Sequence, residues 1–175
     1  MTPPDPDLRN LLNDLIAGRV CIVGVGNRQR GDDGAGPRVI DLRAPAAQGV
    51  WLDAGIVPEN FLEPIARTNP QVVLIVDAVA HGAVPGSMCL LDPSAVDTAA
   101  VSTHAGSLHL LSEYLTARTA ARVKLLAIQP ARLDDGEGLS RPVQESVHQL
   151  AALLSELLTA PPDTAGSLRP GPRKV

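Results

Sequence analysis

A glycine-rich turn directly after an apolar run is the feature that most constrains this chain. The run covers residues 20–25, and the turn overlapping its end reads Gly24-Val25-Gly26-Asn27-Arg28-Gln29-Arg30-Gly31-Asp32-Asp33-Gly34. Glycine lets the backbone turn sharply out of a buried strand without a Cβ clash, and the aspartates place anionic oxygens in the space beyond the strand. The sequence therefore predicts a buried strand, a tight turn that carries acids, and a helix near residues 37–42.

Apolar runs alternate with helical patterns along the rest of the chain. Strands are predicted at residues 19–25, 50–53, 72–76 and 122–128, and helices at residues 8–16, 37–42, 58–66, 104–115 and 143–158. This alternation is typical of an α/β fold, and we expect a three-layer α/β/α sandwich with a mostly parallel five-stranded sheet. The remaining strand, at residues 87–91, is reached by too few residues for a helical crossover. We expect it at an edge and antiparallel to the strand at residues 72–76.

Length and composition limit the domain organisation and the partners. The 175 residues suit one domain, which we place at residues 1–160, followed by a loose tail at residues 161–175 that is rich in Pro, Gly and Ser. An aromatic content of 2% and a net charge of -4 argue against nucleic acid and membrane surfaces as partners. Cys21 and Cys89 lie in apolar runs, which predicts buried, reduced thiols. With no secretory signal and no membrane-spanning run, we expect a cytoplasmic protein.

Three residues from separate segments are candidate metal ligands and catalytic groups. Asp33 follows the first strand, Asp77 ends the apolar run at residues 72–76, and His104 precedes a predicted helix. In parallel sheets ligands bind beyond the carboxyl ends of the strands, so the topology gathers these residues at one rim. Two carboxylates and one imidazole suit Zn, Ni, Fe or Mn and leave coordination positions open for water or substrate.

Each candidate also has a structural alternative. Asp32 and Asp33 can cap the following helix or fix the glycine turn, and His104 can belong to a first helical turn. Asp77 is harder to explain in this way, because a carboxylate at the end of a buried run must be solvated, paired or ligating. Asp53 is expected to brace the loop that follows it. The other histidines are expected to be surface or packing residues: His81, His109 and His148.

A dinucleotide site is the competing interpretation of the glycine turn, because Gly24-x-Gly26 follows a strand and Asp53 ends the next one. The third glycine of G-x-G-x-x-G would fall on Gln29, and the pair Asp32-Asp33 would repel a pyrophosphate. We therefore expect no binding of NAD or ATP.

An ordered series of motifs between about residue 20 and residue 130 resembles the hydrogenase maturation endopeptidases, which trim the C-terminus of the large subunit of nickel-iron hydrogenases. The matching segments are Gly24-Val25-Gly26-Asn27, Gly31-Asp32-Asp33-Gly34-Ala35-Gly36-Pro37, Asp53-Ala54-Gly55, Pro58-Glu59-Asn60, Leu74-Ile75-Val76-Asp77-Ala78, Pro85-Gly86, Asp92-Pro93, Thr103-His104 and Ala127-Ile128-Gln129-Pro130. One such motif is weak, whereas the ordered series is specific.

The resemblance implies that Asp33, Asp77 and His104 are the metal-binding and catalytic residues. It also implies that the metal is nickel supplied by the substrate, the hydrogenase large-subunit precursor, whose C-terminal extension the enzyme removes. Asp53 resembles an acid that the family links to substrate recognition. No general base is evident beyond the carboxylates, and Asp32 is one candidate for it.

Two departures from the family pattern concern the loops. Arg28-Gln29-Arg30 stands where the family usually carries an apolar residue such as Leu or Met, and Ala54 and Ile56 replace the usual Gly and Thr or Ser. We expect the change at residues 28–30 to alter the loop surface and hence the matching large subunit. The alternative function from another class is a non-enzymatic, nickel-sensing chaperone that binds the same precursor without shortening it.

Overall fold

The computed structural model describes residues 6–95 and 105–159 of the chain. The predicted tail at residues 161–175 and His104 lie outside the described residues. The domain limits at residues 1–160 therefore stay a prediction.

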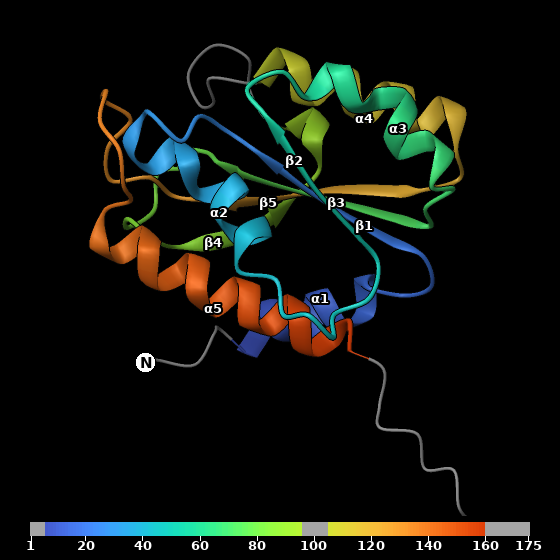
Figure 1. Ribbon diagram of the computed structural model, residues 1–175, viewed down its shortest axis with the longest axis horizontal. Helices are drawn as coiled ribbons and strands as arrows, with labels where there is room; N and C mark the ends of the chain where they lie inside the picture. Colours follow the sequence, from blue (N-terminus) through green and yellow to red (C-terminus); the bar gives the residue numbers. More distant parts are fainter. Residues whose placement is uncertain (1–5, 96–104, 160–175) are drawn as a thin grey trace, which may run out of the picture.

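Five strands form one sheet in the order β2-β1-β3-β5-β4 (Figure 1). β1 (Val20–Val25), β2 (Val50–Gly55), β3 (Val72–Ala78) and β5 (Arg122–Ile128) run parallel, and β4 (Met88–Leu91) pairs antiparallel with β5. The predicted α/β fold, with its mostly parallel sheet and antiparallel edge strand, is confirmed. The hydrogen-bonded neighbour of β4 is β5 rather than β3, because the crossover after β4 inserts β5 between the two.

Helices cover both faces of the sheet, as predicted (Figure 1). α1 (Pro6–Leu15), α2 (Ala35–Asp41) and α5 (Arg141–Leu157) pack on one face, and α3 (Leu62–Arg67) and α4 (Ala105–Arg118) pack on the other. Successive strand residues alternate between the two cores, with Ile22 and Leu74 on the first side and Val23 and Ile75 on the second. Both faces of the central strands are therefore buried.

Two predicted helices differ from the observed ones. The helix expected at residues 37–42 begins at Ala35, after a 3₁₀ turn, η1 (Gly31–Gly34). The helix expected at residues 58–66 is divided into a 3₁₀ turn, η2 (Pro58–Phe61), and α3. Pro64 explains this division, because a residue without an N–H group is tolerated in the first turn of α3 but would break the hydrogen bonding of a helix that began at Pro58. A third such turn, η3 (Pro93–Ala95), follows β4.

α5 is the longest described helix, and it lies along the sheet with one apolar face buried. Its buried residues recur at helical spacing and include Val143, Val147, Leu150 and Leu154. In the described part of the chain, no helix combines the length and the apolar character that crossing a membrane requires.

Glycines let α2 touch the sheet through its backbone. A Cβ atom added to Gly36 would overlap with the carbonyl oxygens of Val25 and Val76, at the ends of β1 and β3. A Cβ atom added to Gly24 would lie 2.5 Å from the carbonyl oxygen of Gly36. The helix therefore sits against the carboxyl ends of two strands at a distance that no side chain permits.

We expect Gly36→Ala to destabilise the fold by about 3 kcal/mol, because backbone atoms cannot yield to the added methyl group as a side chain would. Urea unfolding followed by circular dichroism measures this loss. Gly106→Ala is the matched control, since Gly106 is also helical and a Cβ atom there meets no atom within 4 Å. Equal stability of the two variants would contradict the close contact of α2 with the sheet.

Candidate functional site

Asp33 and Asp77 lie at the carboxyl ends of two neighbouring strands. Asp77 is the sixth of the seven residues of β3, and Asp33 lies in η1, which follows β1. Both side chains are buried. The backbone N–H of Asn27 donates to Oδ2 of Asp33 at 2.9 Å, and the N–H of Ala78 donates to Oδ1 of Asp77 at 2.8 Å. The structure thus places these two acids at one rim of the sheet, as the sequence predicts.

The third predicted ligand, His104, lies outside the described residues, directly before the first residue of α4. Among the residues that the structure describes, no group of three His, Cys, Asp or Glu side chains is arranged to hold a metal ion. Carboxylates such as those of Asp33 and Asp77 are nevertheless chemically able to bind a divalent metal.

Asp32 fixes the loop between β5 and α5. Its Oδ2 accepts hydrogen bonds from the N–H groups of Ala131 and Arg132, at 2.8 and 3.1 Å, and from the hydroxyl of Ser140 at 2.9 Å. Its Oδ1 accepts the N–H of Ser140 at 2.6 Å. Both oxygens of this carboxylate are therefore occupied by hydrogen bonds to the loop. The structure therefore favours the bracing role over the catalytic role for this residue.

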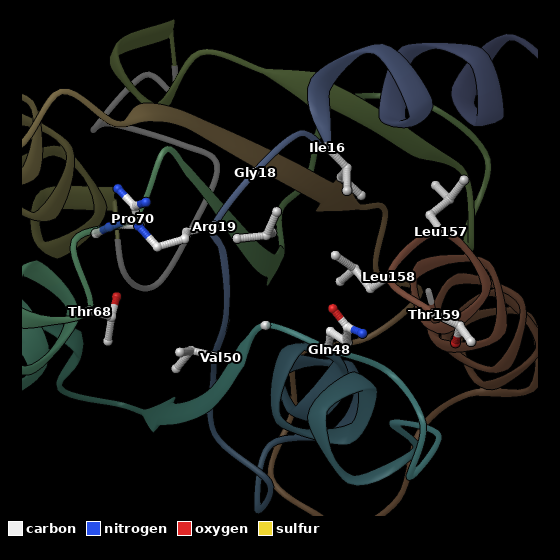
Figure 2. A pocket seen from close by; sticks show the side chains of 12 residues that line it. Ile16, Gly18, Arg19, Gln48, Val50, Thr68, Pro70, Leu157, Leu158 and Thr159 are labelled. Atoms are coloured by element: carbon white, nitrogen blue, oxygen red, sulfur yellow. The ribbon is translucent and has the colours of Figure 1, made fainter. Parts of the chain in front are cut away.

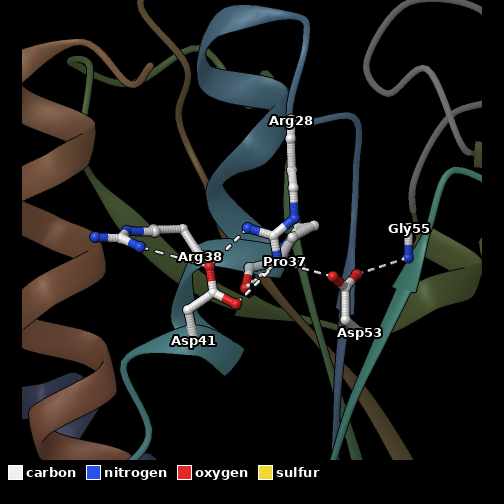
Figure 3. Close-up of polar contacts among 6 residues, drawn as sticks. All are labelled: Arg28, Pro37, Arg38, Asp41, Asp53 and Gly55. Atoms are coloured by element: carbon white, nitrogen blue, oxygen red, sulfur yellow. Dashed lines mark hydrogen bonds and ion pairs between the residues drawn. The ribbon is translucent and has the colours of Figure 1, made fainter. Parts of the chain in front are cut away.

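Asp53 takes part in an ion-pair network on the surface beside the glycine turn (Figure 3). Its Oδ1 accepts the N–H of Gly55 at 2.9 Å, which is the predicted bracing of the loop. Arg28 donates to Oδ2 of Asp53 at 2.8 Å and to both oxygens of Asp41, at 2.6 and 3.0 Å. Arg28 thereby links the loop after β1 to α2 and β2. The sequence predicted a changed surface here but not this network.

Two further polar atoms near this rim are buried without a hydrogen-bond partner among the described residues. They are Oε2 of Glu59, in η2 after β2, and Nε2 of His81, in the loop after β3. The backbone N–H of His81 donates to Oε1 of Gln129 at 2.8 Å. Of the other histidines, His109 lies 3.4 Å from Glu113, and His148 is exposed on α5, so both are surface residues as predicted.

The cysteines do not contribute a nucleophile. Burial raises the pKa of the Cys21 thiol to about 12, so it remains protonated at neutral pH. Cys89 is half-buried rather than buried, because it lies on the edge strand β4, and partial burial also raises its pKa. Both cysteines are free thiols, as predicted.

Two cavities lie at opposite ends of the sheet. One, of about 430 Å³, is lined at the amino ends of β1 and β2 by residues that include Val20 and Val50 (Figure 2). The other, of about 450 Å³, lies beside η1 and is lined by residues that include Arg28, Arg38 and Gln144. The second cavity adjoins the turn that carries Asp33, since Gly31 and Gly34 also line it.

Known proteins share both the sequence pattern and the fold. A family model described as hydrogenase maturation protease matches residues 42–156. The Hydrogenase 3 maturation protease of Escherichia coli (strain K12) is 34% identical over 126 residues, which are 70% of this chain and 80% of that relative. The chain belongs to the hydrogenase maturation protease family. It is accordingly an endopeptidase of hydrogenase maturation, which confirms the sequence prediction and leaves the chaperone alternative without support.

Solved structures agree with this membership. The crystal structure of a nickel-iron hydrogenase maturation protease, HycI from Thermococcus kodakarensis KOD1, has a TM-score of 0.76 and 32% identity, covering 86% of this protease and 99% of that chain. The solution structure of the endopeptidase HycI from Escherichia coli has a TM-score of 0.70 and 28% identity, with coverages of 79% and 90%. The hydrogenase maturating endopeptidase HybD from E. coli shares the fold, with a TM-score of 0.64 and 24% identity over 79% of this chain and 93% of its own.

We expect Asp32→Ala to lower the free energy of unfolding by about 3 kcal/mol, since four donors lose a buried charged acceptor. Hydrogen exchange of the amides of Ala131, Arg132 and Ser140 should accelerate in the same variant. Asp135→Ala is the control, because this aspartate lies in the same loop with its side chain 98% exposed. If exchange at the three amides is unchanged, the bracing role is wrong.

We expect Arg28→Met to lower the free energy of unfolding by about 1 kcal/mol at pH 7. The loss is small because Arg28 and its partners, Asp41 and Asp53, are partly exposed to water. The hydrogen bond from Arg28 holds the pKa of the Asp41 carboxyl below its ordinary value of 3.8. A lowered folded-state pKa stabilises the protein above 3.8, and this contribution is lost as the pH falls through the folded-state value. The difference in free energy of unfolding between wild type and variant should therefore disappear as the pH falls below 3.8. Urea titrations across pH 2.5 to 7 measure it, with Arg141→Met, in an exposed pair within α5, as the control.

Proposed function

We propose that this protease removes the C-terminal extension from the nickel-loaded large-subunit precursor of a hydrogenase, and that it does so in the cytoplasm. The observation that carries the proposal is the pair of buried acids, Asp33 and Asp77, at the ends of neighbouring strands in a chain of this family. His104, directly before α4, completes the proposed set of metal-binding and catalytic residues.

The proposed chemistry is hydrolysis of one peptide bond. Water adds to the scissile carbonyl carbon, the C–N bond breaks, and the released amine takes up a proton. Nickel carried by the precursor supplies Lewis acidity at the scissile bond. The backbone N–H groups of Asn27 and Ala78 orient the carboxylates of Asp33 and Asp77 toward fixed positions.

Nickel is proposed to arrive with the substrate, as the resemblance to the family implies, and the proposed ligand set of Asp33, Asp77 and His104 is compatible with this. Two carboxylates and one imidazole leave coordination positions open, and a substrate that brings its own ligands can fill them. The protease then acts only on precursors whose metal is in place, because an empty precursor lacks the group that these side chains contact.

The experiment that tests the proposal mixes the purified protease with a large-subunit precursor, nickel-loaded or nickel-free, and follows the precursor's mass. A defined C-terminal peptide should be lost from the nickel-loaded form alone. Equal cleavage of both forms would show that cleavage does not require nickel. If the protease binds the nickel-loaded precursor but the mass of the precursor does not change, the proposed cleavage is wrong.

We expect Asp77→Asn to reduce the cleavage rate at least about 100-fold while the protein stays folded, because a neutral amide is a far weaker ligand for a divalent metal than a carboxylate. Circular dichroism and the unfolding midpoint check the fold. Asp92→Asn is the control, since Asp92 pairs only with Lys124 at 2.6 Å in the described structure and follows the edge strand β4. Normal cleavage by the Asp77→Asn variant would overturn the assignment of this residue.

A further inference from the structure

Exposed apolar side chains gather on the two loops that flank the acids. Five large apolar side chains are exposed among the described residues, and three of them lie on the loops after β2 and β3: Ile56, Val57 and Val84. The other two, Leu11 and Leu110, lie on α1 and α4. Exposed apolar surface concentrated beside an active site marks a place where another molecule binds.

The first flank, Ile56 with Val57, directly follows β2. Its position is fixed by the carbonyl oxygen of Gly55, which accepts the N–H of Gly26 at 2.9 Å. Gly26 directly follows β1 and opens the turn that carries Asp33. The first flank therefore lies beside this turn, one strand away from β1.

The second flank, Val84, is held over the end of β5. The N–H groups of His81 and Ala83 donate to Oε1 of Gln129, at 2.8 and 3.3 Å. The N–H of Gly86 donates to the backbone oxygen of Gln129 at 2.8 Å. Because β5 is the neighbour of β3 on the side away from β1, the acids lie between the two flanks.

We propose that the two flanks bind the precursor as an extended segment laid across the rim of the sheet, with apolar side chains on both sides of the scissile bond. This inference rests on the proposed function. Strands lie about 4.8 Å apart, so each flank is about 7 Å from the gap between β1 and β3, which an extended peptide covers in about two residues. The apolar residues of the precursor then lie about two positions from the cut on either side.

Two observations favour the precursor as the molecule that binds to these flanks. The acids are buried at the rim, so a peptide bond that reaches them must pass over the loops on both sides. Residues 54–58 and 82–86 contain no charged side chain, so these loops offer apolar contact and backbone groups rather than ion pairs. A segment of the precursor that is apolar near the cut matches that surface.

The test uses Ile56→Ser, Val84→Ser and the double variant, in steady-state cleavage of the nickel-loaded precursor. Leu11→Ser and Leu110→Ser are matched controls, because these leucines are 52% and 48% exposed against 55% for Ile56 and 73% for Val84. Each flank variant should raise KM about 5- to 10-fold, the double variant more than either, and kcat should change less than about twofold. The controls should leave both constants unchanged, and all variants should keep the wild-type unfolding midpoint.

The outcomes separate this inference from the proposed function. If wild-type protease cleaves no precursor, the proposed function fails. If wild type cleaves but the flank variants keep its KM, or the controls raise KM equally, the flanks do not bind the substrate. Analytical ultracentrifugation of the same proteins tests whether the flanks are instead a contact between two copies of the chain. In that case the flank variants should abolish self-association while KM stays constant.

Discussion

The direct backbone contact between α2 and the sheet is the constraint on which the site depends. Gly36 brings the helix against the ends of β1 and β3, and Gly24 makes room for it within β1. The turn between β1 and α2 must then be short and must pass close to the end of β3. That path places Asp33 at the end of the strand beside the one that carries Asp77. These glycines therefore serve the site by allowing the backbones of α2, β1 and β3 to meet.

Hydrogen bonds from backbone N–H groups to Asp32 and Asp33 hold the acidic turn in place. Asp32 joins it to the loop before α5, and the N–H of Asn27 contacts Asp33. Arg28 adds a connection on the surface to α2 and β2. The two adjacent aspartates therefore have different tasks, since one accepts four hydrogen bonds from a distant loop and the other lies at the rim. A rigid turn of this kind suits the metal site proposed for this rim.

The sequence predicted the elements better than their long-range contacts. β5 lies where the apolar run indicates, at residues 122–128, because a buried parallel strand needs a continuous run of this kind. The antiparallel edge strand at residues 87–91 is confirmed, but its pairing with β5 did not follow from the sequence, since local patterns do not tell which strand a later crossover inserts. The rim shared by Asp33 and Asp77 followed from topology alone. The partners of Asp32 and Arg28 did not, because Ser140 lies 108 positions from Asp32 and Asp53 lies 25 positions from Arg28. No pattern of local spacing predicts such pairs.

The bond between Asn27 and Asp33 has an evolutionary consequence. Its donor is a main-chain N–H, which every residue except proline supplies, so the acid keeps its place whatever side chains the loop carries. The side chains of residues 28–30 are not needed for this hydrogen bond, and in this chain they are Arg-Gln-Arg. Substitutions in this outer surface of the turn can therefore accumulate without displacing Asp33.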